Sequence, residues 1–348
     1  MEINNYYVER NRKGNEKLKC LLKELPDFCM EFFIGKANST SILTRLGYAQ
    51  DYLIFFQFLS ENIPFFYGKL IKEYTLQDLN KVTVTHIEAY LSYLSAYDRN
   101  GETYSNENVT KARKLASVRA LFLYFYRKNL LKENITQKVA TPKIPNKEII
   151  RLDSDEVSNI INVAENGSGL TIRQQSYNKI TSKRDVAILS LFLGTGIRIS
   201  ELVGINIEDV DFISSGFTIT RKGGNRAILY FNEEVKEALF EYLNERKIKE
   251  KENFPVSPAF FISIQNKRMG VRSVEKLVQK YAKIVSPLKP ITPHKLRSTF
   301  GTQLYRATKD IYVVAEVLGH RDVNTTKKHY AAISEDIKKE ASKTVKLR

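Results

Sequence analysis

Apolar residues recur every three or four positions through the first part of the chain, which is the spacing of a helix that buries one face. In the stretch 41–62 this apolar stripe comprises Leu46, Ala49, Leu53, Phe56 and Leu59. The same spacing predicts a second helix over 85–97 and a third over 110–129. We therefore expect residues 24–140 to be entirely helical.

The helix predicted over 110–129 carries bases as well as an apolar stripe. The stripe is Leu115, Val118, Phe122 and Phe125, and the bases in its first half are Lys111, Arg113, Lys114 and Arg119. Bases at one end of an otherwise apolar helix suggest an end that faces phosphate groups. A solvated helix end explains the pattern equally well, so both interpretations stand at this point.

The helical pattern stops at the stretch TPKIPNKEII, residues 141–150. Two prolines and scattered charges predict a linker there. Asp153 followed by Glu156 is typical of a helix start, because a carboxylate at the second position can bind the backbone N–H of the first. The chain is therefore predicted to form a helical domain over 1–140, a second domain over 151–333 and a tail over 334–348.

The second domain mixes helices and strands. Residues 165–182 are polar and aperiodic, which predicts an exposed loop, and 183–205 predict two helices around a glycine-containing turn. Residues 217–231 are two β-rich runs around Gly223 and Gly224, a strong hairpin signal. Further predictions are helices over 233–249 and 271–285, a short strand over 259–263 and short helices from His294 onward. The predicted fold class is mostly α with a small antiparallel β-sheet.

Composition and charge narrow the choice of partner. The 348 residues include 55 Lys and Arg against 39 Asp and Glu, a net charge of +16. This excess favours nucleic acid; a well-solvated basic surface is the plainer explanation, and a membrane surface is a weaker one. No apolar run approaches the roughly 20 residues that cross a bilayer, and the N-terminus is too polar for a signal peptide, so we expect a cytosolic protein. Cys20 and Cys29 lack the spacing of a metal site and are interpreted as packing residues.

Six side chains of the second domain are difficult to explain by packing. They are Arg198 after the glycine turn, Lys222 in the hairpin turn, His294 and Arg297 on one helix face, and His320 and Tyr330 in LGHRDVNTTKKHY. Each alone has an ordinary explanation, such as a surface charge or a packed ring. Their order along the chain is what points to shared chemistry.

In that order the six residues match the signature of the tyrosine recombinases, and the second domain resembles this family in GTGIRISEL, TRKGGNR, TPHKLRSTF and LGHRDVNTTKKHY. The helical domain resembles the family's core-binding domain, and VTKARKLASVRALFLYF is similar to its DNA-contacting helix. Within the family the chain looks most like the single-protein Xer recombinases, although integrases of mobile elements share every motif. One departure is Ser298, where many relatives have a histidine.

The resemblance implies a two-domain architecture and a covalent mechanism. Tyr330 would attack the scissile phosphate and form a 3′-phosphotyrosine. Arg198 and Arg297 would stabilise the charge on the non-bridging oxygens. His320 would donate a hydrogen bond to the same phosphate.

The resemblance implies that two other residues of the signature transfer protons during cleavage. His294 would assist proton transfer from the tyrosine, and Lys222 would protonate the departing 5′-oxygen. Glu201, one helical turn after Arg198, is expected to orient the site, while a carboxylate that interacts with a helix dipole explains it nearly as well. No metal and no cofactor are expected, because the cationic side chains would take the part that Mg²⁺ plays elsewhere.

The resemblance also implies partners. We expect double-stranded DNA with specific recombination sites, contacted by Lys111, Arg113, Lys114 and Arg119, and four protomers on two sites that pass through a Holliday junction. An accessory or directionality protein is compatible with this scheme, and no membrane is expected. The tail 334–348 would dock on a neighbouring protomer. The expected role is chromosome-dimer resolution; the alternatives are an integrase of a mobile element, a topoisomerase of the same chemistry and a regulator without catalysis.

Overall fold

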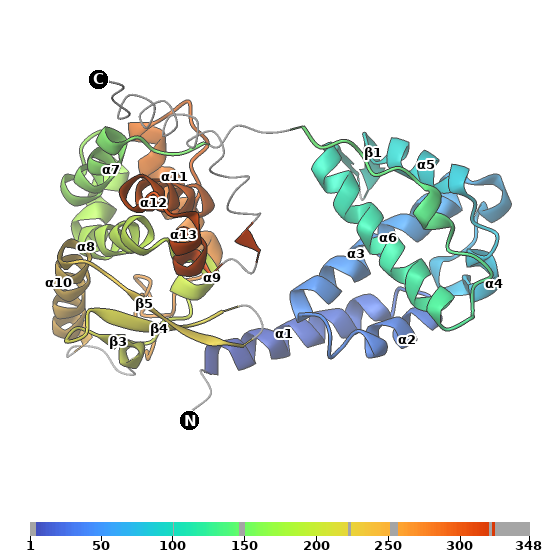
Figure 1. Cartoon of the computed structure of the whole chain (residues 1–348), viewed down its shortest axis with the longest axis horizontal. Coiled ribbons are helices and arrows are strands. Elements are labelled where there is room, and N and C mark those ends of the chain that lie inside the picture. Colours follow the sequence, from blue (N-terminus) through green and yellow to red (C-terminus); the bar gives the residue numbers. More distant parts are fainter. Residues whose placement is uncertain are drawn as a thin grey trace, which may run out of the picture. The chain divides into compact units, whose positions relative to one another are not determined.

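The computed structural model describes residues 5–99, 101–145, 150–221, 224–250, 257–319 and 322–323. The chain forms two compact units, Met1–Lys147 and Glu148–Arg348, each with its own core (Figure 1). The division lies within the segment 141–150, for which the sequence predicts a linker.

The first unit is built mainly from helices. They are α1 (Asn5–Leu22), α2 (Phe28–Gly35), α3 (Ile42–Asn62), α4 (Leu76–Leu79), α5 (Val84–Tyr93) and α6 (Asn108–Arg127), with short 3₁₀ turns at Pro64–Phe66, Ile71–Glu73 and Ile135–Lys138. Helix α3 packs against α1, α5 and α6, so it lies at the centre of the unit.

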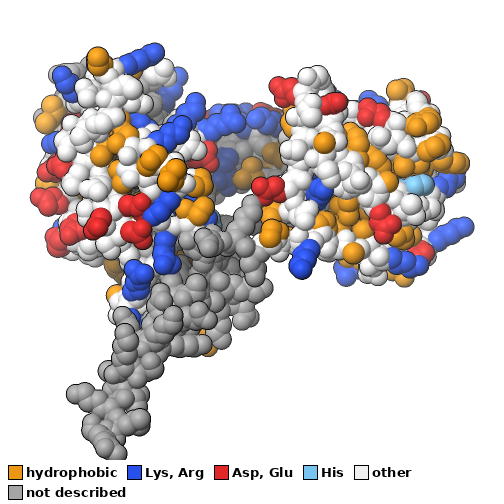
Figure 2. Space-filling model, turned by 90° about the horizontal axis from the view of Figure 1, so that it is seen from above, with side chains coloured by type: hydrophobic (Ala, Val, Ile, Leu, Met, Phe, Trp, Pro, Cys, Tyr) orange, Lys and Arg blue, Asp and Glu red, His pale blue; other side chains and the backbone are white. Residues whose placement is uncertain are grey.

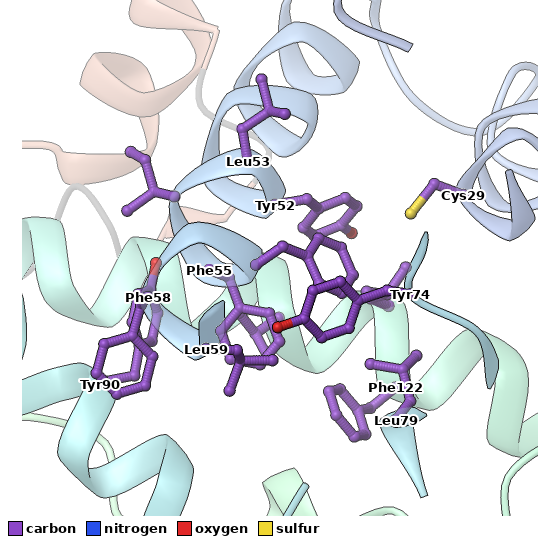
Figure 3. Packing of buried hydrophobic residues seen from close by; sticks show 14 of the residues in the cluster. Cys29, Tyr52, Leu53, Phe55, Phe58, Leu59, Tyr74, Leu79, Tyr90 and Phe122 are labelled. Carbon is purple, nitrogen blue, oxygen red and sulfur yellow. The ribbon is translucent and has the colours of Figure 1, made fainter. Parts of the chain in front are cut away.

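Aromatic and aliphatic side chains from these helices form one continuous core (Figure 3). Phe55 of α3 contacts the rings of Tyr90 on α5 and Phe122 on α6, with ring centroids 5.2 and 6.4 Å apart. The predicted stripe of α6 is fully buried, and that of α3 is buried except for Leu46, which is partly exposed. Burial of one face therefore explains why these segments are helices.

The prediction that 24–140 is entirely helical is wrong at one place. Strands β1 (Tyr97–Arg99) and β2 (Glu102–Tyr104) form a short antiparallel hairpin in which Tyr97 pairs with Tyr104. The rings of these two tyrosines stack 5.6 Å apart. The local cause is the Asn-Gly pair at 100–101, a turn signal that outweighs the helical periodicity on either side.

The second unit combines helices with a small sheet. Its helices are α7 (Ser154–Asn166), α8 (Ile172–Thr195), α9 (Ile199–Leu202), α10 (Glu233–Glu250), α11 (Val271–Val285), α12 (Pro293–Thr308) and α13 (Ile311–Leu318). Its strands are β3 (Val210–Asp211), β4 (Gly216–Thr220) and β5 (Arg226–Tyr230), and a 3₁₀ turn covers Ile207–Asp209. Helix α8 is central, because α7, α10 and α12 all pack against it.

The sheet has the order β3-β4-β5 and is antiparallel throughout. The register of β4 and β5 pairs Gly216 with Tyr230 and Thr220 with Arg226, which confirms the predicted hairpin. The predicted strand over 259–263 is wrong, because this segment forms only two isolated bridges, Asn206 to Ala259 and Ile262 to Arg268. The mostly helical fold class with a small antiparallel sheet is confirmed.

The predicted loop over 165–182 is also wrong in its second half, where α8 begins at Ile172. Thr171 starts the helix, since its hydroxyl accepts a hydrogen bond from the N–H of Gln174 at 3.3 Å. The inward face of this first half is polar: Asn178 donates to the carbonyl of Ala164 on α7 at 2.9 Å. Buried polar residues that find partners remove the apolar period on which the sequence prediction relies.

Charged side chains are scattered over the surface of both units (Figure 2). Figure 2 shows Lys and Arg interspersed with Asp and Glu on the face that it presents. Among the described residues, no helix combines the length and the apolar character that a membrane crossing requires.

Candidate active site around the end of helix α13

Arg198 is held at a sharp turn between two helices of the second unit. Helix α8 ends at Thr195, and Gly196 adopts the left-handed conformation with φ +62° before Arg198 caps α9. A Cβ atom at Gly196 would lie only 2.5 Å from the ring of Phe300 on α12. Glycine is therefore required here both for the backbone angle and for the close approach of α12.

The guanidinium of Arg198 is oriented by a buried carboxylate. Its Nη1 donates to Oε1 of Glu201 at 3.0 Å, and its backbone N–H donates to Oε2 of the same carboxylate at 2.9 Å. Its Nη2 also donates to the carbonyl of Gly319 at 3.2 Å, just beyond the end of α13. The Glu201 side chain is 3% exposed and that of Arg198 is 36% exposed, so one partner anchors the other at the surface.

Arg297 on α12 is buried and also contacts the end of α13. It is 5% exposed, and its guanidinium donates to the carbonyls of Gly196 and Leu318. The first carbonyl belongs to the turn before Arg198 and the second to the end of α13. Arg198 and Arg297 are thus brought together by shared contacts with one helix end.

His294 lies in the first turn of α12, three residues before Arg297, and is exposed. Its carbonyl accepts a hydrogen bond from the hydroxyl of Ser298 at 3.1 Å. Ser298, the position that departs from the family pattern, therefore bonds to the backbone of its own helix. Lys222, His320 and Tyr330 lie outside the described residues.

Arg221, which precedes Lys222, and Gly319, which precedes His320, are described and lie in contact. Arg221 precedes Lys222 at the end of β4, and its Nη2 lies 3.5 Å from the carbonyl of Val317 in α13. Gly319 directly precedes His320, and a Cβ atom built on it would lie 2.1 Å from Nη1 of Arg221. Arg221 was not predicted from the sequence. The motif RKGGNR does not show whether its first arginine contacts a helix end or is solvated.

The arrangement is suited to an anion that carries charge on several oxygens. Guanidinium groups present fixed N–H donors that match phosphate geometry, and they keep their charge at any physiological pH. Glu201 neutralises part of this positive charge while leaving the Arg198 side chain partly exposed. The site is therefore suited to stabilising a phosphate whose negative charge increases during a reaction.

Two of the bases predicted to contact DNA lie at the exposed side of α6. Lys111 donates to the hydroxyl of Ser95 at 2.6 Å. Arg113 makes a two-point contact with Asp51 of α3, at 2.6 and 2.8 Å, and its side chain remains 54% exposed. The hydrogen bond to Asp51 raises the pKa of Arg113. Asp51 is 1% exposed and carries no sequence signal, because its partners are more than sixty positions away.

The other two bases are engaged within the first unit. Lys114 donates to Asp51 at 3.0 Å, and its side chain is 7% exposed. Arg119 donates to the carbonyls of Thr136 and Val139 at 3.2 and 2.6 Å and to the hydroxyl of Thr141 at 2.8 Å. These contacts hold α3 and the segment after α6 in place.

The chain is similar in sequence and in fold to members of one protein family. The family model described as the phage integrase family matches residues 150–336. The chain is 33% identical over 313 residues to the tyrosine recombinase XerC of Caldanaerobacter subterraneus subsp. tengcongensis, covering 87% of the chain and 81% of the relative. It is 28% identical over 348 residues to the tyrosine recombinase XerS of Lactococcus lactis subsp. lactis, covering 93% and 96%.

Among solved structures, the fold is similar to that of the XerH site-specific recombinase bound to its palindromic difH substrate. The TM-score is 0.65 at 18% identity, with 88% of this chain and 82% of the other covered. The two-domain architecture and the mostly helical fold are those of tyrosine recombinases. The chain belongs to the phage integrase family and is a tyrosine recombinase, a site-specific recombination enzyme of the Xer type.

Proposed function

We propose that this recombinase exchanges strands between two copies of one DNA site, through a 3′-phosphotyrosine and a Holliday junction, and that it resolves chromosome dimers. The observation that carries this proposal is the convergence of Arg198 and Arg297 on the carboxyl end of α13, with Arg198 held by Glu201. In the sequence His320 stands two positions after Leu318, the last residue of α13, and Tyr330 stands twelve positions after it. The XerC and XerS relatives align with both units, which supports recombination by the whole chain.

The covalent step conserves the number of phosphodiester bonds. The phenolic oxygen of Tyr330 attacks the scissile phosphorus, and the bond from phosphorus to the 5′-oxygen breaks. His294 accepts the phenolic proton, and Lys222 gives a proton to the departing oxygen. Attack by a 5′-hydroxyl from the partner site reverses the step and releases Tyr330, so no ATP is consumed.

Charge on the phosphate is stabilised by the guanidinium groups and one imidazole. Arg198 and Arg297 bind the non-bridging oxygens, where negative charge increases in the five-coordinate transition state. His320 donates a hydrogen bond to the same group. Glu201 does not contact the phosphate and acts by holding Arg198.

DNA contact by the first unit is proposed for α6. Lys111 and Arg113 have side chains at the surface and are proposed to bind phosphates, which are the main source of affinity for duplex DNA. Lys114 and Arg119 are proposed to support the same surface from within, because their N–H groups are bound to Asp51 and to backbone carbonyls.

The working assembly is proposed to be four protomers on two DNA sites in the cytoplasm, associated with the nucleoid. The tail 334–348 is proposed to dock on a neighbouring protomer, and an accessory or directionality protein is compatible with this assembly. The tail lies outside the described residues.

A binding selection followed by strand exchange tests the function. The full chain is used to select bound duplexes from fragmented genomic DNA, and two copies of the recovered site are then placed on one plasmid. Recovery of a single site near the replication terminus, with excision between the two copies, is expected. Sites at the ends of a mobile element would make the protein an integrase, and relaxation of supercoils without any preferred site would make it a topoisomerase. Selective binding without a covalent complex would identify a regulator.

A further inference from the structure

The backbone of Arg221 is held in the hairpin by two hydrogen bonds. Its N–H donates to the carbonyl of Asn225 at 2.8 Å, and its own carbonyl accepts from the N–H of Gly224 at 3.1 Å. The first bond continues the pairing of the two chain segments beyond the Thr220–Arg226 pair, and the second joins residues three positions apart, as in a turn. The side chain of Arg221 therefore starts from a rigid position.

The guanidinium of Arg221 lies against the backbone of Gly319. A Cβ atom built on Gly319 would be 2.1 Å from Nη1, 2.3 Å from Cζ and 2.9 Å from Nη2 of Arg221, which are distances that real atoms do not tolerate. Gly319 has φ +62°, a conformation that favours glycine on its own account. The guanidinium of Arg221 therefore occupies the space that a side chain at position 319 would need.

Three arginines hold three successive carbonyls at the end of α13. Arg221 is placed toward the carbonyl of Val317, Arg297 donates to that of Leu318, and Arg198 donates to that of Gly319. The last carbonyls of a helix lack partners within the helix and carry partial negative charge, so cations stabilise them. The arginines come from the residue after β4, from α12 and from the turn before α9, and their contacts link these segments to one helix end.

Arg221 is not placed for stability alone. Its Nε is buried and has no hydrogen-bond acceptor among the residues that the structure describes. A buried donor without a partner costs free energy, and such a group in a folded protein calls for an explanation. The contact of Arg221 with Val317 is also long, at 3.5 Å. These two observations are better explained if Arg221 fixes the position of the carboxyl end of α13.

We propose that Arg221 is a positioning residue of the active site, which fixes the end of α13 so that Arg198 and Arg297 meet the phosphate in the correct orientation. The proposal rests on the proposed function of those two arginines. Arg221 does not contact the phosphate or the leaving group. It acts through the helix end to which both arginines are bonded.

A double-mutant cycle between Arg221 and Gly319 tests the contact in the free protein. Gly319→Ala strains the backbone in any background. Only when Arg221 is present does the added methyl group also clash with a guanidinium and displace it. We expect Gly319→Ala to lower the thermal unfolding midpoint of the full chain by at least about 2 °C more in the wild-type background than in Arg221→Ala. Equal shifts in the two backgrounds would show that the two groups do not touch and would overturn the proposal without any reference to catalysis.

The same variants are then compared in single-turnover cleavage of a selected site. Arg221→Ala is expected to slow cleavage by at least tenfold while changing site affinity less than threefold, and Gly319→Ala should add little to it. A sulfur at the bridging 5′ position should not restore the rate, because the defect lies at the non-bridging oxygens. Arg226→Ala is the matched control, since Arg226 is an exposed base on the same hairpin, and it should cleave normally.

Three results of the cleavage assay would also overturn the proposal: normal cleavage by Arg221→Ala, full rescue by the sulfur substrate, or an equal defect in Arg226→Ala. Absence of cleavage by the wild-type protein on every selected site would instead reject the proposed function. In that case the cycle in unfolding midpoints still decides whether Arg221 fixes the helix end.

Discussion

The carboxylate of Glu201 binds Arg198 at two points, the backbone N–H at 2.9 Å and the guanidinium at 3.0 Å. The carboxylate is buried, whereas the guanidinium reaches the surface. We predict that Glu201→Gln slows single-turnover cleavage by about 10- to 100-fold, because one oxygen that orients Arg198 becomes an NH₂ group and a charged hydrogen bond worth ~1.5–3 kcal/mol is lost. DNA affinity should change by less than threefold, as measured by fluorescence anisotropy.

The matched control for Glu201 is Glu237→Gln, which neutralises an exposed carboxylate on α10. It should cleave at the wild-type rate. If Glu201→Gln also cleaved at that rate, Glu201 would have no part in orienting Arg198.

Tyr330 is predicted to be the nucleophile. Tyr330→Phe should abolish covalent capture of a nicked suicide substrate, while site binding stays within a few fold, because one hydroxyl is lost from a large interface dominated by phosphate contacts. The assay is run in EDTA, where wild-type capture should persist. A covalent complex formed by the Phe variant would show that another residue attacks the phosphate, and a loss of wild-type capture that Mg²⁺ restores would contradict the metal-free mechanism.

Lys222 is predicted to protonate the departing 5′-oxygen. An alkoxide leaves poorly near neutral pH, so Lys222→Ala should slow cleavage by roughly 10²–10⁴-fold on ordinary DNA. A thiolate leaves without a proton, so a bridging 5′-sulfur should restore the rate of this variant almost to that of the wild type. Arg198→Ala serves as the comparison and should gain much less. Equal rescue of both variants would remove Lys222 from the role of acid.

Neighbouring bases of α6 are predicted to differ in their effect on DNA binding. Arg113→Gln should weaken binding to the selected site and reduce the slope of log affinity against log salt by about 1, since one phosphate contact is lost. Lys114→Met should leave that slope unchanged, because Lys114 is buried against Asp51. The measurement is a salt titration of affinity for each variant, with unfolding midpoints recorded to confirm folding. A reduced slope in Lys114→Met alone would reverse the assignment.

The start of the second unit is predicted to weaken in acid. Glu156 accepts hydrogen bonds from Lys289 at 2.6 Å, from the N–H of Asp153 at 2.8 Å and from Ser286 at 2.7 Å. Burial acts to raise the pKa of Glu156, but the hydrogen bond from Lys289 and the two others outweigh it, so the pKa lies below its ordinary value. A lowered carboxylate pKa stabilises the fold above the unfolded value of about 4.3, and this contribution is lost as the pH falls through the folded value.

Lys289→Met tests this dependence. The wild-type protein should unfold at a higher temperature than the variant at pH 7, and the gap should close between about pH 5 and pH 3. The difference should be modest, because both side chains are partly exposed. Lys283→Met, which removes an exposed lysine of α11, should show no such gap. A gap of the same size at pH 3 and pH 7 would contradict the role of Glu156.

Local patterns in the sequence determined much of the fold. The stripe Leu115, Val118, Phe122 and Phe125 is buried as predicted, because a helix with one apolar face can be stable only when that face packs. Paired glycines between two β-rich runs likewise predicted the β4–β5 hairpin, since the turn and the flanking alternation are local signals. The order of the six signature residues identified the family before any contact was known.

Contacts between distant segments were decided only by the tertiary structure. Arg297 reaches a carbonyl 101 residues away, and Lys114 meets Asp51 across 63 positions, distances over which no periodicity operates. The first half of α8 was mistaken for a loop because its inward side chains are polar, such as Asn178, whose amide donates to the carbonyl of Ala164 on α7. Arg221 became visible as part of the site only when the hairpin and the end of α13 were brought together. The contacts of Arg297, Lys114 and Asn178 pair buried polar groups, and the partner of such a group is defined by the folded chain.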